Sequence, residues 1–416
     1  MKTLLTFLNQ SYLIFVAAIC FSLTTCISNN PRKDKSAVQS QDTFAIAPFE
    51  GLITVDLTKK YPEKEFVVDD ADKEFIFLET TDEVLADRDF KLQYVSDKRI
   101  VASNRGRGDI FFFGRDGKVI SFVNRKGNSG TEYSDMVSIV FDEQNSEIFV
   151  VDYLTKQRCL VYSEDGKFLR QFYFPPNSWI TDVYNFDEQT LLAYNGHRVG
   201  EHHAGDINQR MPYVFLSKKD GSVVSRLELS FEKRISDRHF IRVEGGAIPF
   251  TISSNNIVKN GQEFIIAERS SDTVYVLTQD KKLTPLLVRT PTVFNENTLI
   301  TLSVDAKTER YLFLWSVSYN WDEIVEQWKK GQQLTLPPAN KLVYDSHTGE
   351  VFNTVESIPR SVDSPERIGI DMYHADRLVE RFEKGELKGK LKQIAQTIKD
   401  TKKDINPIVV ITRYVF

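Results

Sequence analysis

The chain has 416 residues, 41% of them hydrophobic, and a formal net charge of −5. This length can bury a large core, as one big domain or two ordinary ones. Its Lys and Arg residues are scattered along the sequence, which argues against a nucleic-acid-binding surface. The 29 Phe and 16 Tyr residues, against only 4 Met, favour strands over helices.

The first predicted element is a targeting segment. Lys2 precedes an apolar run of signal-peptide length at 12–23, which is too short to span a membrane comfortably. The run ends in Leu-Thr-Thr-Cys at 23–26, which resembles the lipobox of bacterial lipoproteins, although Thr25 departs from the usual small residue. We expect a signal peptide over residues 1–25, lipid attachment at Cys26 and a flexible polar tether over 26–48. A plain secretory signal with an incidental cysteine is the alternative.

Once Cys26 is lipidated, Cys159 is the one other cysteine of the mature chain, so the sequence contains no disulfide framework. Cys159 lies in an apolar run, where a small buried hydrophobe is expected rather than a reactive thiol. No stretch after residue 26 is predicted to cross a membrane.

A repeated pattern follows, in which an apolar strand, a tight polar turn and a second apolar strand recur. Asp-Gly or Thr-Gly marks most of these turns and is a strong hairpin signal. The copies lie at 109–123, 158–174, 212–229, 272–289 and 340–355. In the clearest unit two further strand-like runs, 136–144 and 146–152, precede the hairpin. Four antiparallel strands per unit and this spacing are typical of propeller blades.

Five such units leave strand-like pieces at both ends of the chain, at 52–57, 74–81 and 406–416. In a ring of blades, strands from both chain ends can pair in one shared blade, which closes the ring. The sequence therefore predicts an all-β, six-bladed β-propeller of four-stranded antiparallel blades over residues 49–416, closed by a composite N/C-terminal blade. It leaves open which N-terminal piece closes the ring.

The unit at 130–172 resembles an NHL-type propeller repeat, from its glycine-containing connector to its final strand pair. The segments 76–85, 125–133 and 406–411 make the whole chain similar to the six-bladed β-propeller lipoproteins common in Bacteroidetes. Ser129-Gly130-Thr131 stands where that family usually has Gly-Pro. The resemblance implies a fold and a cell-envelope location, but no activity and no catalytic residues.

Candidate ligand residues lie on one rim of the ring. Loops from the second to the third strand emerge on the same face as the connectors between blades, because neighbouring strands alternate in direction. Polar groups near a central channel are the default ligand site of such a ring. The alternative is that they cap turns and tie blades together. The candidates are Asn104, Arg105, Glu132, Tyr133, Asp152, Tyr153, Asn195, Glu268 and Arg269.

Three insertions interrupt the repeats. The loop 195–211 holds His197, His202, His203 and Asp206, weak metal candidates because loop spacing fixes no ligand geometry. A solvated loop is the favoured interpretation, and we expect neither a metal nor a cofactor. Apolar side chains at helical spacing predict short helices at about 321–331 and over 375–404, the second with a break near Gly385.

No catalytic motif occurs in the sequence. Gly127 and Gly130 do not form a phosphate loop, because a strand follows them rather than a helix. The favoured hypothesis is a non-catalytic scaffold in the cell envelope that binds a glycan, a peptide or an envelope protein. Its membrane contact is the N-terminal lipid, and the expected location is the outer membrane, with the chain facing the periplasm or the cell surface. The alternative is a propeller lyase or hydrolase acting on a glycan or lactone through residues such as Asp152, Glu268 or His202.

Overall fold

The computed structural model describes most of the chain beyond its N-terminal segment, and the described residues belong to one compact unit. They are residues 51–413 except 67–71, 153–156, 197–205, 245, 253, 295–297, 333–336, 356–359 and 402–404. The expected signal peptide, the lipidation site Cys26 and the tether lie outside them.

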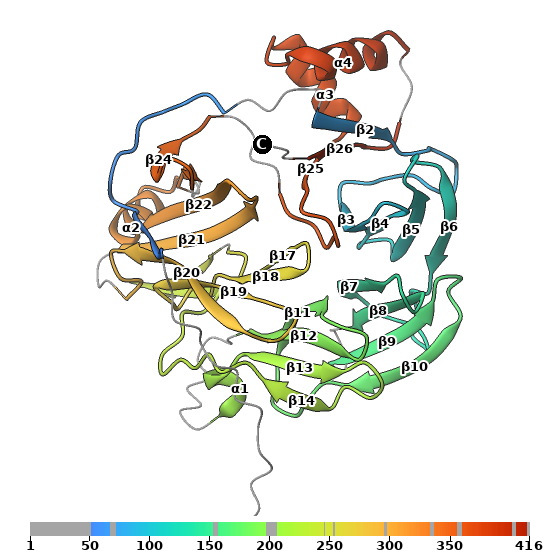
Figure 1. Cartoon of the computed structure of the whole chain (residues 1–416), viewed down its shortest axis with the longest axis horizontal. Helices are drawn as coiled ribbons and strands as arrows, with labels where there is room; N and C mark the ends of the chain where they lie inside the picture. The colour runs from blue at the N-terminus through green and yellow to red at the C-terminus, as the bar shows by residue number, and fades with distance from the viewer. Residues whose placement is uncertain are drawn as a thin grey trace, which may run out of the picture. The chain divides into compact units, whose positions relative to one another are not determined.

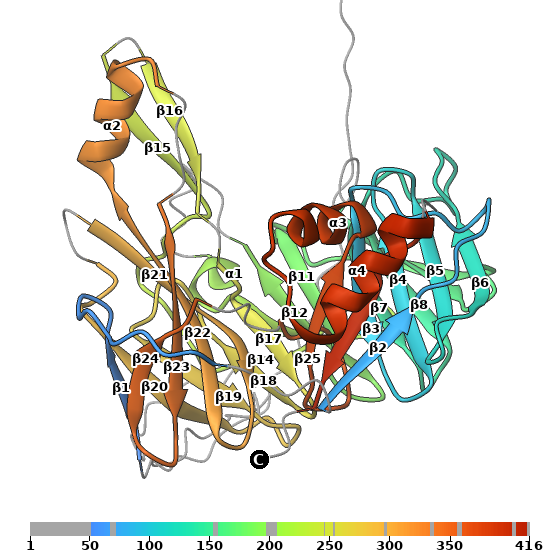
Figure 2. The same cartoon turned by 90° about the horizontal axis from the view of Figure 1, so that it is seen from above.

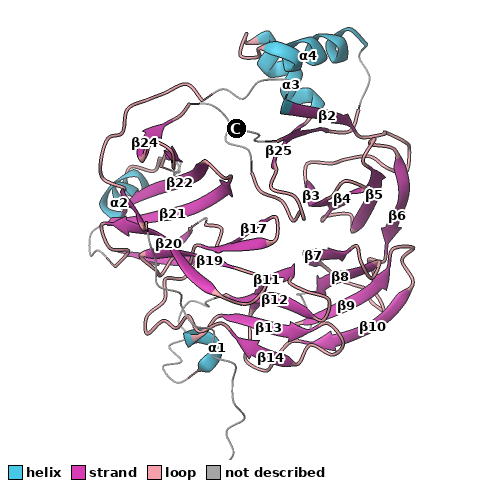
Figure 3. Ribbon diagram, viewed as in Figure 1, coloured by secondary structure: helices cyan, strands magenta, loops and turns pink. Residues whose placement is uncertain are grey.

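Six antiparallel sheets surround a central axis, so the predicted six-bladed β-propeller is confirmed (Figures 1 and 3). Each of the first five blades has four consecutive strands, the first nearest the axis. Blade 1 is β3 (Phe90–Val95), β4 (Arg99–Asn104), β5 (Asp109–Gly114) and β6 (Val119–Asn124). Blade 2 is β7 (Met136–Asp142), β8 (Glu147–Asp152), β9 (Arg158–Ser163) and β10 (Phe168–Tyr173). Blade 3 is β11 (Ile180–Asn185), β12 (Thr190–Asn195), β13 (Tyr213–Ser217) and β14 (Val223–Arg226). Blade 4 is β17 (Ile257–Asn260), β18 (Glu263–Ile266), β19 (Thr273–Leu277) and β20 (Leu283–Thr290). Blade 5 is β21 (Thr298–Lys307), β22 (Tyr311–Asn320), β23 (Ala339–Asp345) and β24 (Glu350–Asn353).

Blade 6 combines both ends of the chain. Its strands β25 (Gly369–Tyr373) and β26 (Ile408–Thr412) come from the C-terminal part, and β2 (Lys73–Phe77) pairs antiparallel with β26. Nearer the axis, Arg360 pairs with Ile370 of β25, so residues 360–363 occupy the place of the innermost strand. The N-terminal piece that closes the ring is therefore the one predicted at 74–81.

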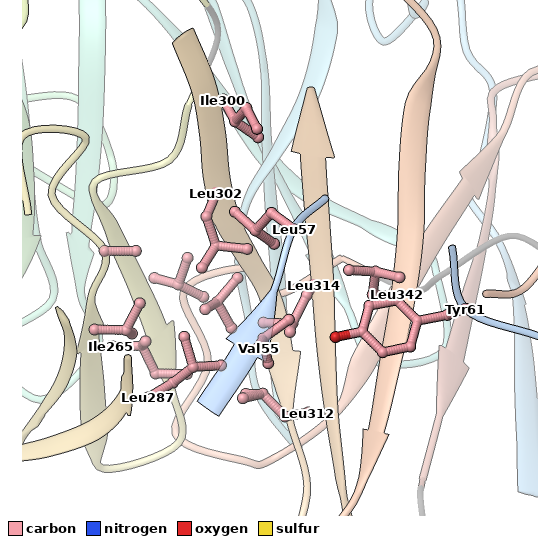
Figure 4. Packing of buried hydrophobic residues seen from close by; sticks show 14 residues of the cluster. Val55, Leu57, Tyr61, Ile265, Leu287, Ile300, Leu302, Leu312, Leu314 and Leu342 are labelled. Carbon is pink, nitrogen blue, oxygen red and sulfur yellow. The ribbon is translucent and has the colours of Figure 1, made fainter. Parts of the chain in front are cut away.

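The other N-terminal piece has a different partner. Strand β1 (Ile53–Asp56) runs parallel to β20 as a fifth strand of blade 4. The chain then reaches blade 5, where Glu63 pairs with Asn353 of β24. Side chains of this segment, Val55 among them, fill the wedge between the two blades (Figure 4). Residues 53–66 thus cover the outer edges of blades 4 and 5, which would otherwise expose unpaired backbone groups.

Tight turns join the third and fourth strands of the first five blades, as the repeated pattern predicts. Glycine takes the left-handed conformation in most of these turns, and in the fourth copy Lys281 does so instead, with φ 63°. Cys159 of β9 is fully buried, as expected, and this burial raises the pKa of its thiol. Among the described residues no helix is long and apolar enough to cross a membrane.

The insertions lie near the predicted positions. Helix α2 (Trp321–Lys329) follows β22, and α3 (Ala375–Glu383) and α4 (Gly389–Thr401) lie between β25 and β26. Gly385 breaks the last pair with φ 75°, as predicted. A short helix, α1 (Ile207–Arg210), ends the loop of blade 3.

The sequence analysis missed one hairpin, formed by β15 (Arg238–Val243) and β16 (Gly246–Thr251) between blades 3 and 4. With α2 and the ends of β21 and β22 it forms a projecting arm (Figure 2). Its sequence signal is a Glu-Gly-Gly turn between two short runs that contain apolar residues.

Candidate functional site in the channel and the sixth seam

The predicted rim residues lie where the topology argument places them, at the ends of second strands and on connectors, but most are engaged inside the protein. Asp152, the last residue of β8, is fully buried. One carboxylate oxygen accepts hydrogen bonds from the Ser134 hydroxyl (2.7 Å) and from the Asp135 backbone (3.2 Å). The other accepts from Arg158 Nε (3.0 Å) and Nη2 (2.9 Å). Asp152 therefore fastens the connector before blade 2.

Asn104, Asn195 and Glu268 are also hydrogen-bonded to groups of the protein in other blades. Asn104 donates to the Leu85 carbonyl (3.0 Å) and Asn195 donates to the Asn208 carbonyl (2.7 Å). Glu268 accepts hydrogen bonds from the Tyr213 hydroxyl and the Ser270 hydroxyl, each at 3.0 Å. All three side chains are buried.

The remaining described rim residues are Arg105, Glu132, Tyr133 and Arg269. Arg105 is exposed and pairs with Asp135 (2.6 Å). Tyr133 is buried, donates to the Gly108 carbonyl (2.7 Å) and has a pKa raised to about 12 by burial. Arg269 is buried, and its Nε and Nη1 have no hydrogen-bond partner among the described residues.

Glu132 closes the glycine-containing connector onto itself. Its carboxylate accepts a hydrogen bond from the Ser129 backbone (2.9 Å) and occupies the space above Gly127. A β-carbon at Gly127 would lie 2.1 Å from Oε2 of Glu132. The connector therefore holds its own side chain where a phosphate cradle would hold a ligand.

Tyr153 and the three histidines of the predicted metal loop, His197, His202 and His203, lie outside the described residues. Asp206 is described and caps α1 by accepting a hydrogen bond from the Asn208 backbone (2.8 Å). Within the described part of the chain, no three His, Cys, Asp or Glu side chains gather as metal ligands would.

A polar channel runs along the axis, bounded by the innermost strands. Its cavity of about 310 Å³ is bordered by ionisable side chains from five blades. They are Lys91, Asp182, Tyr184, Lys259, Asp305, Arg360 and Asp363. In β3, β7 and β11 a register shift near Gln93, Val137 and Thr181 adds one residue to the strand, and all three residues border the channel. Bulges of this kind re-aim side chains next to functional sites.

The acidic groups of the channel hold their protons more tightly than usual. Asp182 and Asp363 border the cavity, but protein surrounds them on their other sides and disfavours their charged forms. Burial raises the pKa of Asp182, and it raises the pKa of Asp363 to about 6, while the nearby Lys259 acts in the opposite direction. Burial also raises the pKa of Asp305 and lowers that of Lys259.

The segment 360–363 lines the channel and contacts several blades. The Ser361 backbone donates to the Asp305 carbonyl of blade 5 (2.9 Å), and its hydroxyl donates to the Lys259 carbonyl of blade 4. The Asp363 carbonyl accepts a hydrogen bond from the Val95 backbone of blade 1 (3.0 Å). One short segment thus joins three blades and borders the channel.

Seams, meaning the interfaces between neighbouring blades, are not alike around the ring. Buried apolar clusters join blades 6 and 1, 1 and 2, 2 and 3, 3 and 4, and 4 and 5. Among the described residues no such cluster joins blades 5 and 6. The face of blade 5 there packs on Phe66 of the N-terminal segment, and the face of blade 6 packs on α3 and α4.

A cleft of about 590 Å³ occupies this seam and adjoins the channel. We call it the 5–6 cleft. It shares Lys91, Leu92, Asp305, Arg360, Ser361 and Val362 with the channel. Its other lining residues are Trp315, Lys341, Ile370, Asp371, Met372 and Tyr373. A concave site with apolar walls and a few convergent polar groups is the usual form of a ligand pocket.

The residues that line the channel and the 5–6 cleft were not predicted, because the candidate residues were taken from loops and strand ends. The available signal was a charged side chain inside an otherwise apolar first strand, such as Asp305 in TLITLSVDAK or Lys259 in IVKN. A charged side chain in a strand that packs only against apolar surface would be buried at a cost in free energy, whereas in a strand that borders a channel it can reach solvent or a ligand.

Comparisons with known proteins agree with this architecture. The family model described as "Domain of unknown function (DUF4934)" matches residues 52–413. The chain belongs to the DUF4934 family. No curated protein matches this DUF4934 chain.

Two solved structures from Bacteroides are similar to this DUF4934 protein, and the one with a TM-score above 0.5 shares its fold. A Bacteroides fragilis protein described as exported has 13% identity and a TM-score of 0.58, over 87% of this chain and 100% of its own. A member of the DUF4221 family from Bacteroides vulgatus has 9% identity and a TM-score of 0.42, over 67% of this chain and 83% of its own. At these identities the likeness concerns the fold alone.

Proposed function

We propose that this DUF4934 protein is a cell-envelope lipoprotein whose propeller binds a small polar ligand in the 5–6 cleft and the adjoining channel. One observation carries the proposal: apolar clusters close five seams, while the sixth holds a polar cleft that leads to the axis. A seam that no apolar cluster joins, as is the case here among the described residues, forgoes stabilising apolar contacts, and a ligand-binding role would explain why it is kept.

The predicted anchor supports the envelope location. Cys26 follows an apolar run directly and precedes a polar tether. The likeness of residues 130–172 to an NHL-type repeat supports the propeller, and the likeness of the chain to Bacteroidetes propeller lipoproteins supports the same compartment. So does the description of the structurally similar Bacteroides fragilis protein as exported.

We expect Cys26→Ala to abolish incorporation of radiolabelled palmitate and to release the protein from the membrane fraction, because the thiol is the acylation site. Cys20→Ala, in the same apolar run, is the control and should leave the labelling intact. Unchanged labelling of the Cys26 variant would overturn the lipid anchor.

Trp315 of β22 provides the test of the ligand site. Ligands from a panel of glycans and short peptides that raise the melting temperature should lose about tenfold in affinity in Trp315→Leu. Removing an aromatic wall costs about 1.4 kcal/mol of binding free energy, which corresponds to this factor. The measurement is isothermal titration calorimetry of each stabilising ligand.

Trp328→Leu is the matched control, because Trp328 lies on α2 with 42% of its surface exposed and does not border the cleft. The Trp328→Leu variant should bind each stabilising ligand with the same affinity as the unaltered protein. Ligands that bind both variants equally well would place the binding site elsewhere and contradict the proposal.

An enzyme is the second candidate. Asp182, Asp305 and Asp363 border the channel, and burial raises the pKa of each, as in carboxylic acids that act as general acids. In the same binding experiment, chromatography of the recovered ligand separates the two ideas. Intact ligand supports the binding protein, and cleaved ligand supports the enzyme.

A further inference from the structure

We infer that the ligand of the 5–6 cleft is an acidic oligosaccharide, a short glycan that carries uronic-acid carboxylates. This inference rests on the proposed function and specifies its ligand. It combines the charges that meet in the cleft, the engagement of the backbone that lines it, and the aromatic side chains in its walls.

Cationic side chains of three different blades meet at the cleft. Lys91 comes from β3 of blade 1, Lys341 from β23 of blade 5, and Arg360 from the inner segment of blade 6. The acidic groups that border it are Asp305 and Asp371. Both Lys341 and Arg360 act on the Asp305 carboxyl and lower its pKa, whereas burial acts the other way and dominates. Three positive groups border the cleft with two carboxyls, so the lining carries an excess of positive charge that suits a ligand carboxylate.

The backbone of Arg360, Ser361 and Ile370 in the cleft is already engaged. Arg360 and Ile370 exchange both of their backbone hydrogen bonds (2.9 and 3.1 Å), and the Ser361 N–H donates to the Asp305 carbonyl. A peptide that binds by adding a strand needs free backbone groups along an edge. These positions offer side chains instead, which suits a ligand recognised through carboxylates and hydroxyls.

Aromatic side chains stand in walls formed by different blades. Trp315 belongs to blade 5 and Tyr373 to blade 6, and both border the cleft while remaining half-buried. The C–H face of a pyranose ring is apolar and packs well on an aromatic ring, while its edge carries hydroxyls and the carboxylate. A cavity of about 590 Å³ lies in the range of small-ligand pockets.

The test uses a tetramer of galacturonic acid and the same tetramer with its carboxyls reduced to alcohols. Isothermal titration calorimetry on the full chain, purified in detergent, should give at least tenfold tighter binding of the acidic tetramer. Lys341→Met and Arg360→Met should each weaken that binding about tenfold, because charge-assisted hydrogen bonds are lost. Neither should change binding of the reduced tetramer by more than about twofold.

Lys392→Met, an exposed lysine on α4, is the control and should bind like the unaltered protein. Equal binding of both tetramers, or unchanged binding in the two cleft variants, would overturn the inference that the ligand is an acidic oligosaccharide. If neither tetramer binds, the inference of an acidic oligosaccharide is overturned as well. The proposed function then still stands or falls separately, by whether any other stabilising ligand loses affinity in Trp315→Leu.

Discussion

Replacing Asp152 by alanine is expected to lower the free energy of unfolding by about 3–5 kcal/mol, because it leaves the Arg158 guanidinium buried without its charged partner. The side chains of the pair are 0% and 9% exposed, and Nη2 of Arg158 lies 2.9 Å from the carboxylate. Ser134 and Asp135 lose their acceptor at the same time. Urea unfolding followed by far-ultraviolet circular dichroism measures the effect.

Two comparisons make this expectation specific. Glu326→Ala removes an exposed ion pair to Lys330 on α2 and should change stability far less, since solvent screens such pairs. Asp152→Ala combined with Arg158→Leu should be milder than Asp152→Ala alone, because no buried charge then remains unpaired. A double variant as unstable as the sum of its single changes would contradict this explanation.

Replacing Gly221 by alanine is expected to lower the free energy of unfolding by about 2–4 kcal/mol, the sum of backbone strain and a steric clash. Gly221 has φ 72° in the turn between β13 and β14. A β-carbon there would lie 2.2 Å from the ring of Phe172, a buried residue of the preceding blade. The turn of blade 3 therefore packs directly on blade 2, and the midpoint of urea unfolding reports the change.

Gly349 is the matched control for the clash. It has φ 70° in the corresponding turn of blade 5, but nothing lies within 4 Å of its would-be β-carbon. Gly349→Ala should cost only the backbone strain, about 1 kcal/mol. Equal losses at both glycines would mean that the contact with Phe172 contributes nothing.

Much of the fold follows from local patterns that recur. Asp-Gly turns between apolar runs predicted the outer hairpins, because that dipeptide reaches the left-handed turn conformation easily. Apolar side chains at helical spacing predicted α2 and the pair α3 and α4. The hairpin β15–β16 has no such repeat, and it was missed.

The candidate site could not be found in the same way. The rim argument placed Asp152, Asn195 and Glu268 on the correct loops but could not tell whether their side chains pointed to a ligand or inward. The structure turns these three toward protein partners: Ser134 for Asp152, the Asn208 carbonyl for Asn195 and Tyr213 of blade 3 for Glu268. Which way a polar side chain points depends on the neighbouring segment, and a strand pattern does not specify it.

The sequence by itself determined the number of blades, their four-stranded build and their closure by both chain ends, because these rest on strand periodicity and turn chemistry that act over a few residues. Only the tertiary structure decided that residues 73–77 close the ring while 53–56 extend blade 4. It also decided that no apolar cluster joins blades 5 and 6 among the residues that the structure describes, and that Lys91, Lys341 and Arg360 border the cleft there. The pairings of β1 with β20 and of β2 with β26, and the approach of Lys91 to Lys341, join residues more than 200 positions apart, and their free energy exists only when the ring has closed.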